Sequence, residues 1–165
     1  VQLLQGQLWS FSVSYPPMSD DQARTWFSRL SQLLGRYGTF YFGDPRCKRP
    51  RGAWAGTPIV NGGTQTGQTL AISGFTVGTD ICGGDYFQLS TGSSSRLHMV
   101  TQDAVADGSG NITADIWPRL RESPTNSGAI VTATPQGVFR LATSNVSKTF
   151  EPFRNGISLE IVEAL

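Results

Sequence analysis

The sequence predicts a mainly β protein with one α-helix, in which a discontinuous β-sandwich-like domain carries an inserted small β-barrel. Two observations support this prediction. Residues 8–45 read as strand, helix and strand, and residues 136–165 read as further strands of the same sheet. The segment between them is rich in glycine, low in charge and patterned as short strands separated by turns. We therefore expect residues 1–45 and 136–165 to form one domain around an insertion of residues 46–135.

The composition of the chain limits the classes of function. The 165 residues are enough for one ordinary domain, or for a modest domain with a compact insertion. Thirteen lysines and arginines against twelve aspartates and glutamates give a net charge of +1, so no overall field attracts nucleic acid or an anionic membrane. No apolar stretch reaches the roughly 18 residues of a membrane helix, and the N-terminal residues do not resemble a signal peptide. We expect neither membrane insertion nor a leader.

The first predicted strand covers residues 8–15. Mostly polar residues alternate there with a row of aromatic and apolar ones: Trp9, Phe11, Val13 and Tyr15. Alternation of this kind is typical of a strand with one buried face. Two consecutive prolines follow and end the strand, because proline cannot donate a hydrogen bond to a ladder.

A helix is predicted from Ser19 onward. Ser19 and Gln22 have the spacing of a capping box, in which each side chain accepts a hydrogen bond from the backbone of the other. An apolar stripe at helical spacing follows: Ala23, Trp26, Phe27, Leu30, Leu33 and Leu34. We expect the helix to end at Gly35 or Gly38 and its stripe to pack on the sheet. The residues expected to be buried together are Trp26, Phe27, Leu30, Phe11, Phe40 and Phe139.

A short aromatic strand is predicted at residues 39–42, and a cluster of basic residues follows it. The cluster consists of Arg46, Lys48, Arg49 and Arg51. Such a cluster can contact phosphates, although the prolines and glycine around it exclude a regular basic helix. We favour a solvated linker, or pairing with acidic groups of a neighbouring subunit. The residues alone leave these alternatives open.

The insertion and the C-terminal segment contain the remaining predicted strands. They are residues 69–72, 86–89, 97–105, 111–117, 129–133, 137–142, 146–150 and 157–162. Glycine-rich turns separate them. Residues 107–111 have oxygen ligands at alternate positions, but Pro118 stands where a calcium loop needs a bidentate Glu. We therefore interpret this segment as a hairpin turn.

No catalytic or cofactor-binding motif is apparent, and we predict a protein that is not an enzyme and holds no cofactor or metal. His98, the only histidine, lies in a predicted strand without partners grouped around it, and we interpret it as structural or facing solvent. Cys47 and Cys82 are expected to be free thiols. With one histidine they do not supply the four ligands of a zinc site.

Four carboxylates and three aromatic residues keep two alternatives open. The carboxylates are Asp85, Asp103, Asp115 and Glu122, and the aromatic residues are Trp54, Tyr86 and Trp117. A converging pair of carboxylates would supply the acid and base of a wall-degrading glycosidase, although their spacing does not favour it. Exposed aromatic rings would stack on sugars. In that alternative the chain is a carbohydrate-binding module that contacts a cell-surface glycan through the inserted barrel.

Several short motifs, taken in order, resemble a family of tail proteins of long-tailed bacteriophages and prophages. They are LGRYGTF (34–40), GDP (43–45), QTGQTL (65–70), GDYFQL (84–89), IWPRLR (116–121) and VFRL (138–141). The architecture expected above is also similar to that of distal tail proteins, which close the tail tube with a ring of β domains. In some of these proteins an inserted barrel faces outward.

The resemblance implies a structural protein of the virion, located at the tail tip. It implies a homo-oligomeric ring, a hexamer or alternatively a trimer, that joins the tail tube protein to the baseplate hub protein. It implies neither specific nucleic-acid recognition nor membrane insertion. In such a ring we expect the basic cluster to be a subunit contact or a lumen-facing loop, because tight phosphate binding would retard the passage of DNA.

Overall fold

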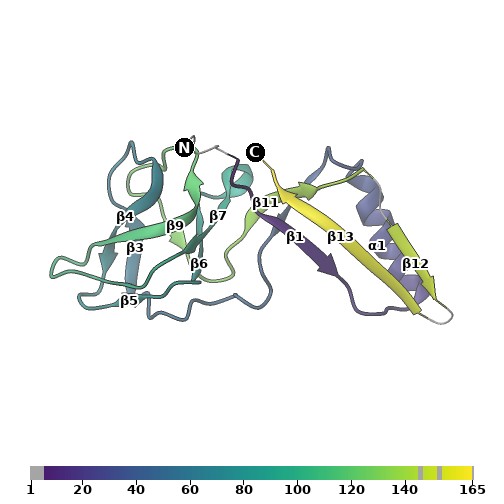
Figure 1. Cartoon of the computed structure of the whole chain (residues 1–165), viewed down its shortest axis with the longest axis horizontal. Coiled ribbons are helices and arrows are strands. Elements are labelled where there is room, and N and C mark those ends of the chain that lie inside the picture. The colour runs from purple at the N-terminus through teal and green to yellow at the C-terminus, as the bar shows by residue number, and fades with distance from the viewer. Residues whose placement is uncertain (1–5, 145–146, 152–153, 165) are drawn as a thin grey trace. The chain divides into compact units, whose positions relative to one another are not determined.

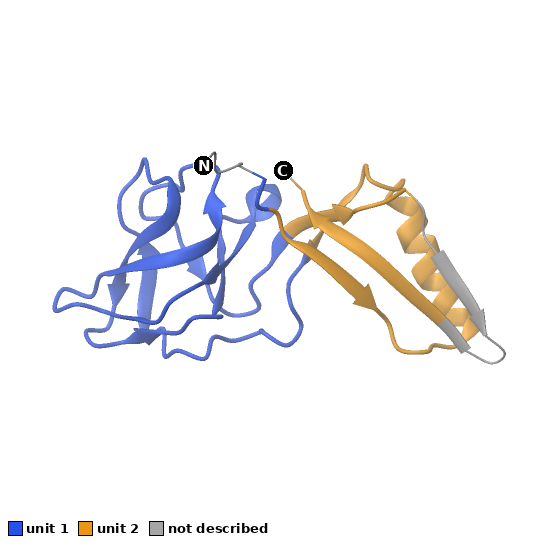
Figure 2. Ribbon diagram, viewed as in Figure 1, with its two compact units in different colours: residues 1–7, 42–137 blue, residues 8–41, 138–165 orange. Residues whose placement is uncertain are grey.

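The computed structural model describes residues 6–144, 147–151 and 154–164. The described chain is mainly β with one α-helix, as the sequence predicts. It forms two compact units (Figure 2): unit 1 consists of residues 1–7 and 42–137, and unit 2 of residues 8–41 and 138–165.

The N-terminal end belongs to a different unit from the one expected. The prediction placed all of residues 1–45 and 136–165 in one domain, whereas residues 6–7, 42–45 and 136–137 lie in unit 1. For the N-terminal residues the reason is local. The Gln7 side chain accepts a hydrogen bond from the Arg119 N–H at 3.4 Å, and the Arg121 guanidinium donates to the Gln7 carbonyl.

Unit 1 contains a six-stranded sheet in the order β10-β6-β7-β9-β4-β3, with antiparallel neighbours throughout (Figure 1). Its strands are β3 (Gly56–Val60), β4 (Gly67–Phe75), β6 (Tyr86–Leu89), β7 (Arg96–Val100), β9 (Ile112–Leu120) and β10 (Ile130–Val131). A 3-10 turn, η1 (Gly92–Ser94), connects β6 to β7. The short strands β5 (Asp80–Ile81) and β8 (Ala104–Val105) pair separately.

The sheet of unit 1 is a nearly closed barrel, which confirms the predicted barrel-like insertion. Its two end strands approach each other through an antiparallel bridge between Ile59 and Ala129. The Val60 N–H donates to the Gly128 carbonyl at 2.9 Å, and the Ser127 N–H donates to the Val60 carbonyl at 2.9 Å. These contacts form a seam that covers the sheet edges, which would otherwise offer unpaired backbone groups.

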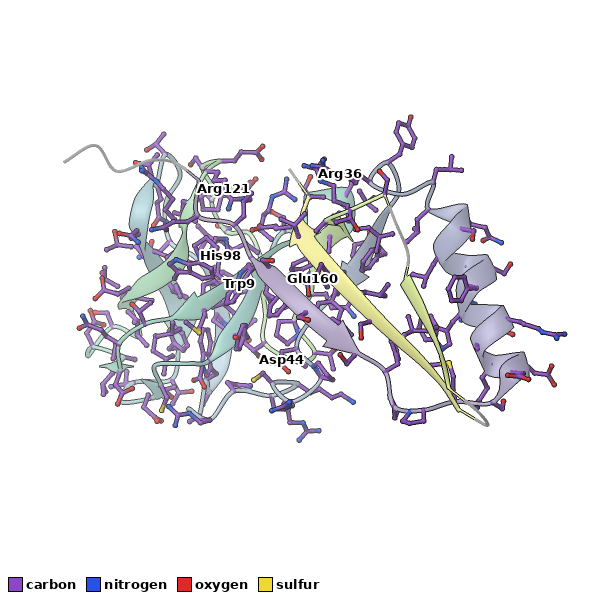
Figure 3. All side chains as sticks on the ribbon, turned by 45° about the vertical axis from the view of Figure 1, so that its right-hand side comes forward. Trp9, Arg36, Asp44, His98, Arg121 and Glu160 are labelled. Atoms are coloured by element: carbon purple, nitrogen blue, oxygen red, sulfur yellow. The ribbon has the colours of Figure 1, made fainter. Side chains whose placement is uncertain are left out.

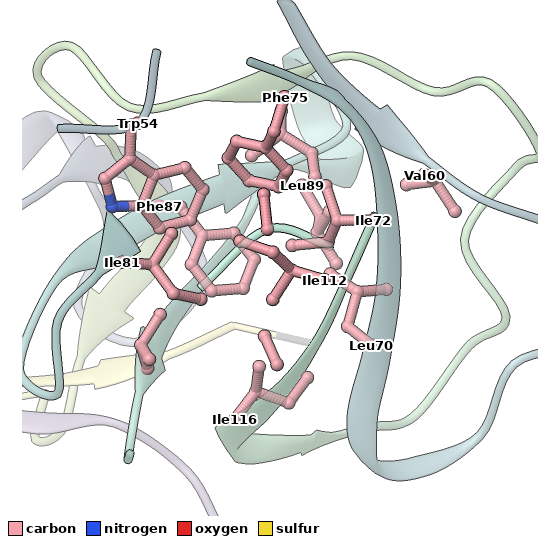
Figure 4. Packing of buried hydrophobic residues seen from close by; sticks show 14 of the residues in the cluster. Trp54, Val60, Leu70, Ile72, Phe75, Ile81, Phe87, Leu89, Ile112 and Ile116 are labelled. Carbon is pink, nitrogen blue, oxygen red and sulfur yellow. The ribbon is translucent and has the colours of Figure 1, made fainter. Parts of the chain in front are cut away.

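The inside of the barrel is a continuous apolar core (Figure 4). Its fully buried members include Leu70, Ile72, Ile81, Phe87, Val100 and Ala114. Trp54 packs beside Phe75 and Phe87, with ring centroids 5.7 Å and 5.8 Å away, and its indole nitrogen turns away from Phe75 (Figure 4). This core gives unit 1 its own source of stability.

Strand β3 has no counterpart among the predicted strands. It contains Pro58, which cannot donate to a ladder and is confined to sheet edges and bulges. The β3–β4 register shifts between Gly56 and Ile59, and Gly56 has a φ of 114°. A bulged edge strand of this kind has no regular alternation for the sequence to display.

Unit 2 contains a sheet in the order β1-β13-β11-β2, with β12 also paired to β13. Its strands are β1 (Ser10–Ser14), β2 (Thr39–Phe42), β11 (Gly137–Leu141), β12 (Ser147–Glu151) and β13 (Arg154–Glu163). The β1 and β13 strands are antiparallel neighbours although they come from opposite ends of the chain. Trp9, labelled in Figure 3, extends their pairing. Its carbonyl accepts the Glu163 N–H at 2.9 Å.

The two faces of this sheet differ as the alternation predicts. On one face Phe11 is opposite Ile161 and Val13 is opposite Leu159, and both partners on β13 are buried. On the other face Ser12 is opposite Glu160, and both of these are exposed. The apolar face therefore carries the core of unit 2.

Helix α1 (Asp20–Gln32) begins at the predicted capping box. The Gln22 N–H donates to the Ser19 hydroxyl at 3.4 Å, and the Ser19 N–H donates to the Gln22 side chain at 3.1 Å. The helix contacts β13, and Trp26 packs against Tyr15 with ring centroids 4.6 Å apart. Of the stripe within the helix, Ala23 and Leu30 are buried.

The predicted end of the helix, and with it the expected burial of Leu34, is wrong. The helix ends at Gln32 rather than at a glycine, and Leu34 is 73% exposed. Leu34 and Gly35 both have left-handed backbone, with φ values of 52° and 68°, so the chain leaves the helical path before Leu34. Gly35 is required there, because a Cβ atom would lie 3.0 Å from the Ser144 backbone.

The burial expected around the stripe is only partly observed. Leu30 and Phe139 are buried. The other four residues, Trp26, Phe27, Phe11 and Phe40, are half-buried. One helix on one sheet does not enclose six large side chains, so the core of unit 2 reaches the surface.

Candidate functional site

The basic cluster lies on an exposed segment of unit 1 that leads into β3. Its four side chains, Arg46, Lys48, Arg49 and Arg51, are all exposed. The Arg46 N–H donates to the Asp44 carboxylate at 2.8 Å, and the Thr134 N–H donates to the Lys48 carbonyl at 2.7 Å. The Arg51 guanidinium also donates to the Gly83 carbonyl at 2.5 Å. The backbone of the segment is therefore held in place, while its four basic side chains remain exposed.

A buried carboxylate, Asp85, anchors the C-terminal end of this segment. It accepts four hydrogen bonds: from the N–H groups of Arg51 (2.6 Å), Gly52 (3.1 Å) and Cys82 (2.9 Å), and from the Trp54 indole (2.8 Å). Burial acts to raise the pKa of Asp85, but these donors favour the charged form and hold the pKa below its ordinary value. Asp85 is thus a structural acceptor.

Gly52 permits the close approach of the basic segment to residues 80–85. A Cβ atom at this position would lie 2.9 Å from the Asp80 carbonyl and 2.9 Å from the Asp85 carboxylate. Asp80 adds a further contact, because its carboxylate accepts the Ala53 N–H at 3.3 Å. In the sequence, Gly83-Gly84-Asp85 indicated only a turn, and nothing in it showed that the carboxylate points into the protein.

The other carboxylates considered for hydrolysis occupy separate positions. Asp103 accepts the Gly83 N–H at 2.7 Å, Asp115 lies on β9 opposite Thr69 of β4, and Glu122 is exposed after β9. Two of the four carboxylates are therefore occupied by backbone donors. Among the described residues, no group of three or more His, Cys, Asp or Glu side chains is arranged to hold a metal ion.

The three candidate stacking aromatics are not equivalent. The expectation that Trp54 is exposed is wrong: its side chain is 5% exposed, because the barrel core and the Asp85 carboxylate hold it inside. Tyr86 and Trp117 are half-buried. Both are register partners of Met99, so the three side chains form a row across β6, β7 and β9.

His98 is buried in β7, one of the two alternatives expected for it (Figure 3). Its ring stacks on Phe87 at 5.6 Å, and its Nδ1 lies 2.9 Å from the Pro118 carbonyl. A carbonyl only accepts, so Nδ1 carries the proton in the neutral ring. Burial, together with the charges of Arg121 and Arg96, lowers the pKa of His98 to about 4 despite this hydrogen bond.

Both cysteines are free, as predicted. Desolvation and nearby carboxylates raise the pKa of each thiol, with Asp44 the main charge at Cys47 and Asp85 at Cys82. Each thiol therefore stays protonated and weakly nucleophilic at neutral pH.

Unit 2 exposes large apolar side chains near its end strand β2. Leu34 is 73%, Tyr37 87% and Tyr41 55% exposed. Tyr41 lies on β2 itself, and the other two lie in the connection between α1 and β2. The sequence pattern placed Leu34 in the core and gave no indication about the two tyrosines.

A hollow of about 330 Å³ opens beside the barrel seam of unit 1. Its lining comes from the ends of β3 and β6 and from the loop before β10: Val60, Leu89, Ser90, Thr91, Pro124, Thr125, Gly128 and Ala129. The sequence did not predict this site, because its walls come from three segments that only the barrel closure brings together.

Comparison with models of protein families finds no match, and comparison with curated proteins finds none either. Within the described part of the chain, no helix has the length and apolar character needed to cross a membrane. The surfaces described above are therefore the basis for a functional assignment.

Proposed function

We propose that this chain is a structural protein of a bacteriophage tail tip, which forms a homo-oligomeric ring and joins the tail tube to the baseplate hub. The observation that carries the proposal is the open sheet of unit 2. Along the order β1-β13-β11-β2 this sheet ends at β1 and β2, and no further strand lies beyond either of them in the described chain, while β12 pairs with β13 beside this path.

The two ends of the sheet are chemically different. Strand β1 carries the exposed serines Ser10, Ser12 and Ser14, whereas the exposed residues of β2 are Thr39 and the aromatic Tyr41. A closed ring uses heterologous contacts, in which two different surfaces of one subunit meet those of its neighbours. Two unlike ends of one sheet supply such a pair. Exposed sheet edges also favour pairing with another chain, so assembly would cover them.

The half-buried aromatic residues of unit 2 support the same proposal. Trp26, Phe27 and Phe40 retain exposed surface although they belong to its apolar layer. Contact with a neighbouring subunit would remove part of this surface from water. Such burial stabilises the assembly by about 25 cal/mol per Å² of apolar area. Unit 1 differs in that its barrel encloses an apolar core of its own, although Tyr86 and Trp117 on its strands are also half-buried.

The basic cluster takes a secondary role in this proposal. Its exposed side chains suit a subunit contact or a loop that faces the lumen of the ring. Binding to DNA would then depend on phosphate charge, weaken steeply with added salt and show no preference for sequence. Tight, sequence-selective DNA binding at physiological salt would contradict this role.

Two measurements test the ring. The first is the mass of the purified chain by light scattering, with electron microscopy of the particles, over a wide range of concentration. We expect a closed ring of defined subunit number, a hexamer or a trimer. The second is mass spectrometry of intact virions, in which the chain should be present together with a tail tube protein and a baseplate hub protein. A chain that stays monomeric and is absent from virions would overturn the proposal.

Carbohydrate binding through the barrel is the second candidate function. The burial of Trp54 removes one of its three stacking residues. The observation that favours this function is instead the hollow at the seam, which has an apolar floor and a rim of hydroxyl groups.

A further inference from the structure

We infer that the hollow beside the barrel seam is a binding site for one uncharged saccharide unit. The inference deepens the second candidate function by naming its site and ligand class. It concerns unit 1 alone and does not depend on ring formation.

The floor of the hollow is apolar and belongs to the barrel core. Val60 ends β3 and Leu89 ends β6, and their side chains are only 2% and 4% exposed. Because Val60 and Leu89 are so deeply buried, the apolar surface that a ligand can reach comes mainly from Pro124 and Ala129 on the side of the loop. A pyranose ring presents a face of C–H groups, which such a surface can cover without leaving a polar group unpaired.

The rim of the hollow carries hydroxyl groups. Ser90, Thr91 and Thr125 are exposed, and each hydroxyl can donate one hydrogen bond and accept others. Sugar hydroxyls have the same dual capacity. No ionisable side chain is among the lining residues, so the site offers no opposite charge to a charged ligand. An ion would lose hydration there without gaining an ion pair.

The walls are fixed before any ligand enters. The seam bonds between Val60, Ser127 and Gly128 hold the loop, and the Gly128 N–H also donates to the Thr125 carbonyl at 3.0 Å. The Gln88 side chain donates to the Ser90 carbonyl at 2.9 Å. Pre-formed walls reduce the entropy lost on binding.

Backbone strain is present on both sides of the hollow. Ser90 and Ser127 have φ values of 61° and 60°, in the left-handed region that residues with a side chain seldom adopt. Strained residues of this kind are over-represented at ligand sites. The volume of about 330 Å³ is near the lower end of the roughly 300–1,000 Å³ of small-molecule pockets, which suits a single ring rather than a chain of sugars.

The test is ligand-observed NMR on the purified full chain with a panel of monosaccharides. The neutral members are glucose, galactose, N-acetylglucosamine, N-acetylgalactosamine and rhamnose, and the charged members are glucuronate and sialic acid. We expect saturation transfer to at least one neutral sugar, with weaker or no transfer to the charged ones. Binding of no neutral sugar, or equal binding of the charged ones, would overturn the inference.

Two variants locate the site. Ala129→Phe fills the hollow from an exposed position, and we expect it to weaken binding about tenfold or more. Ala55→Phe makes the same change at an exposed position before β3 that does not line the hollow, and it should bind as the unchanged protein does. A sugar that binds Ala129→Phe and the unchanged protein equally would retain carbohydrate binding but reject this site.

Discussion

The two units of this chain differ in how they cover the edges and the apolar core of a small β-sheet. Unit 1 closes its sheet through the Ile59–Ala129 bridge and encloses its own apolar core. Unit 2 leaves its sheet open at β1 and β2 and covers it with a single helix, so that aromatic residues of its core remain half-exposed. Unit 1 therefore encloses its core within its own sheet, whereas we propose that unit 2 gains stability from contact with another copy of the chain.

The largest loss of stability is expected when the buried carboxylate of unit 1, Asp85, is removed. Asp85→Ala removes the acceptor of four hydrogen bonds, and the buried donors of Trp54 and Gly52 then have no partner. We expect a loss of about 3–5 kcal/mol in the free energy of unfolding, measured by urea denaturation. Asp103→Ala serves as the control, because Asp103 is exposed and accepts a single hydrogen bond from the described residues, that of the Gly83 N–H, and it should cost much less. Equal losses would show that Asp85 is not an anchor.

A pH dependence is expected from His98 in the same unit. Its folded pKa of about 4 lies below the unfolded value of 6.5. Above pH 6.5 the His98 ring is neutral in both the folded and the unfolded state. Between pH 6.5 and pH 4 the ring takes up a proton only in the unfolded state, so the free energy of unfolding decreases as the pH falls. The complete loss, reached below pH 4, is about 3 kcal/mol.

The non-titrating variant His98→Gln isolates this contribution from that of the carboxylates. Urea denaturation between pH 7 and pH 4 should show a steeper loss of stability for the unchanged protein than for the variant. Parallel pH profiles would mean that His98 is protonated as easily in the folded as in the unfolded state.

Unit 2 should tolerate the loss of an aromatic side chain better than unit 1. Trp26 contacts Tyr15 but is half-buried. We expect Trp26→Ala to cost about 2 kcal/mol, compared with the roughly 3–5 kcal/mol of a fully buried aromatic such as Phe87. Chemical denaturation of the two alanine variants under dilute, monomeric conditions measures the difference. A larger loss at Trp26 than at Phe87 would reverse the comparison.

The smallest effect on stability, with a large effect on assembly, is expected at the exposed tyrosines. Tyr37→Ser combined with Tyr41→Thr should change the free energy of unfolding of the monomer by less than about 0.5 kcal/mol, because both side chains are exposed. The same variant should shift the chain from rings to monomers in light scattering. Val77→Ser with Val105→Thr removes similarly exposed apolar side chains from unit 1 and should leave assembly unchanged.

The parts of the fold that the sequence predicts are those with strong local signals. The alternation of residues 8–15 and the Ser19–Gln22 capping box both lead to the observed β1 and α1. Strand β3 was missed because a proline and a bulge hide its pattern, and Leu34 was misplaced because its left-handed backbone cannot be read from its side chain. Local signals fail where the backbone departs from regular geometry.

The candidate sites were less predictable than the fold. The exposed basic cluster is visible in the sequence because it is continuous. The hollow is not, since Val60, Leu89 and Thr125 meet only after the barrel closes. The inward position of Asp85 was equally hidden, because a Gly-Gly-Asp turn has the same sequence whether its carboxylate faces solvent or protein.

Hydrogen exchange followed by mass spectrometry, at low and high protein concentration, tests most directly whether unit 2 is completed by another copy. At low concentration we expect the amides of β1 and β2 to exchange much faster than those of β9 in the barrel. At high concentration β1 and β2 should become protected, while β9 should not change. Protection of β1 and β2 that equals that of β9 at low concentration, or that does not rise with concentration, would contradict the account.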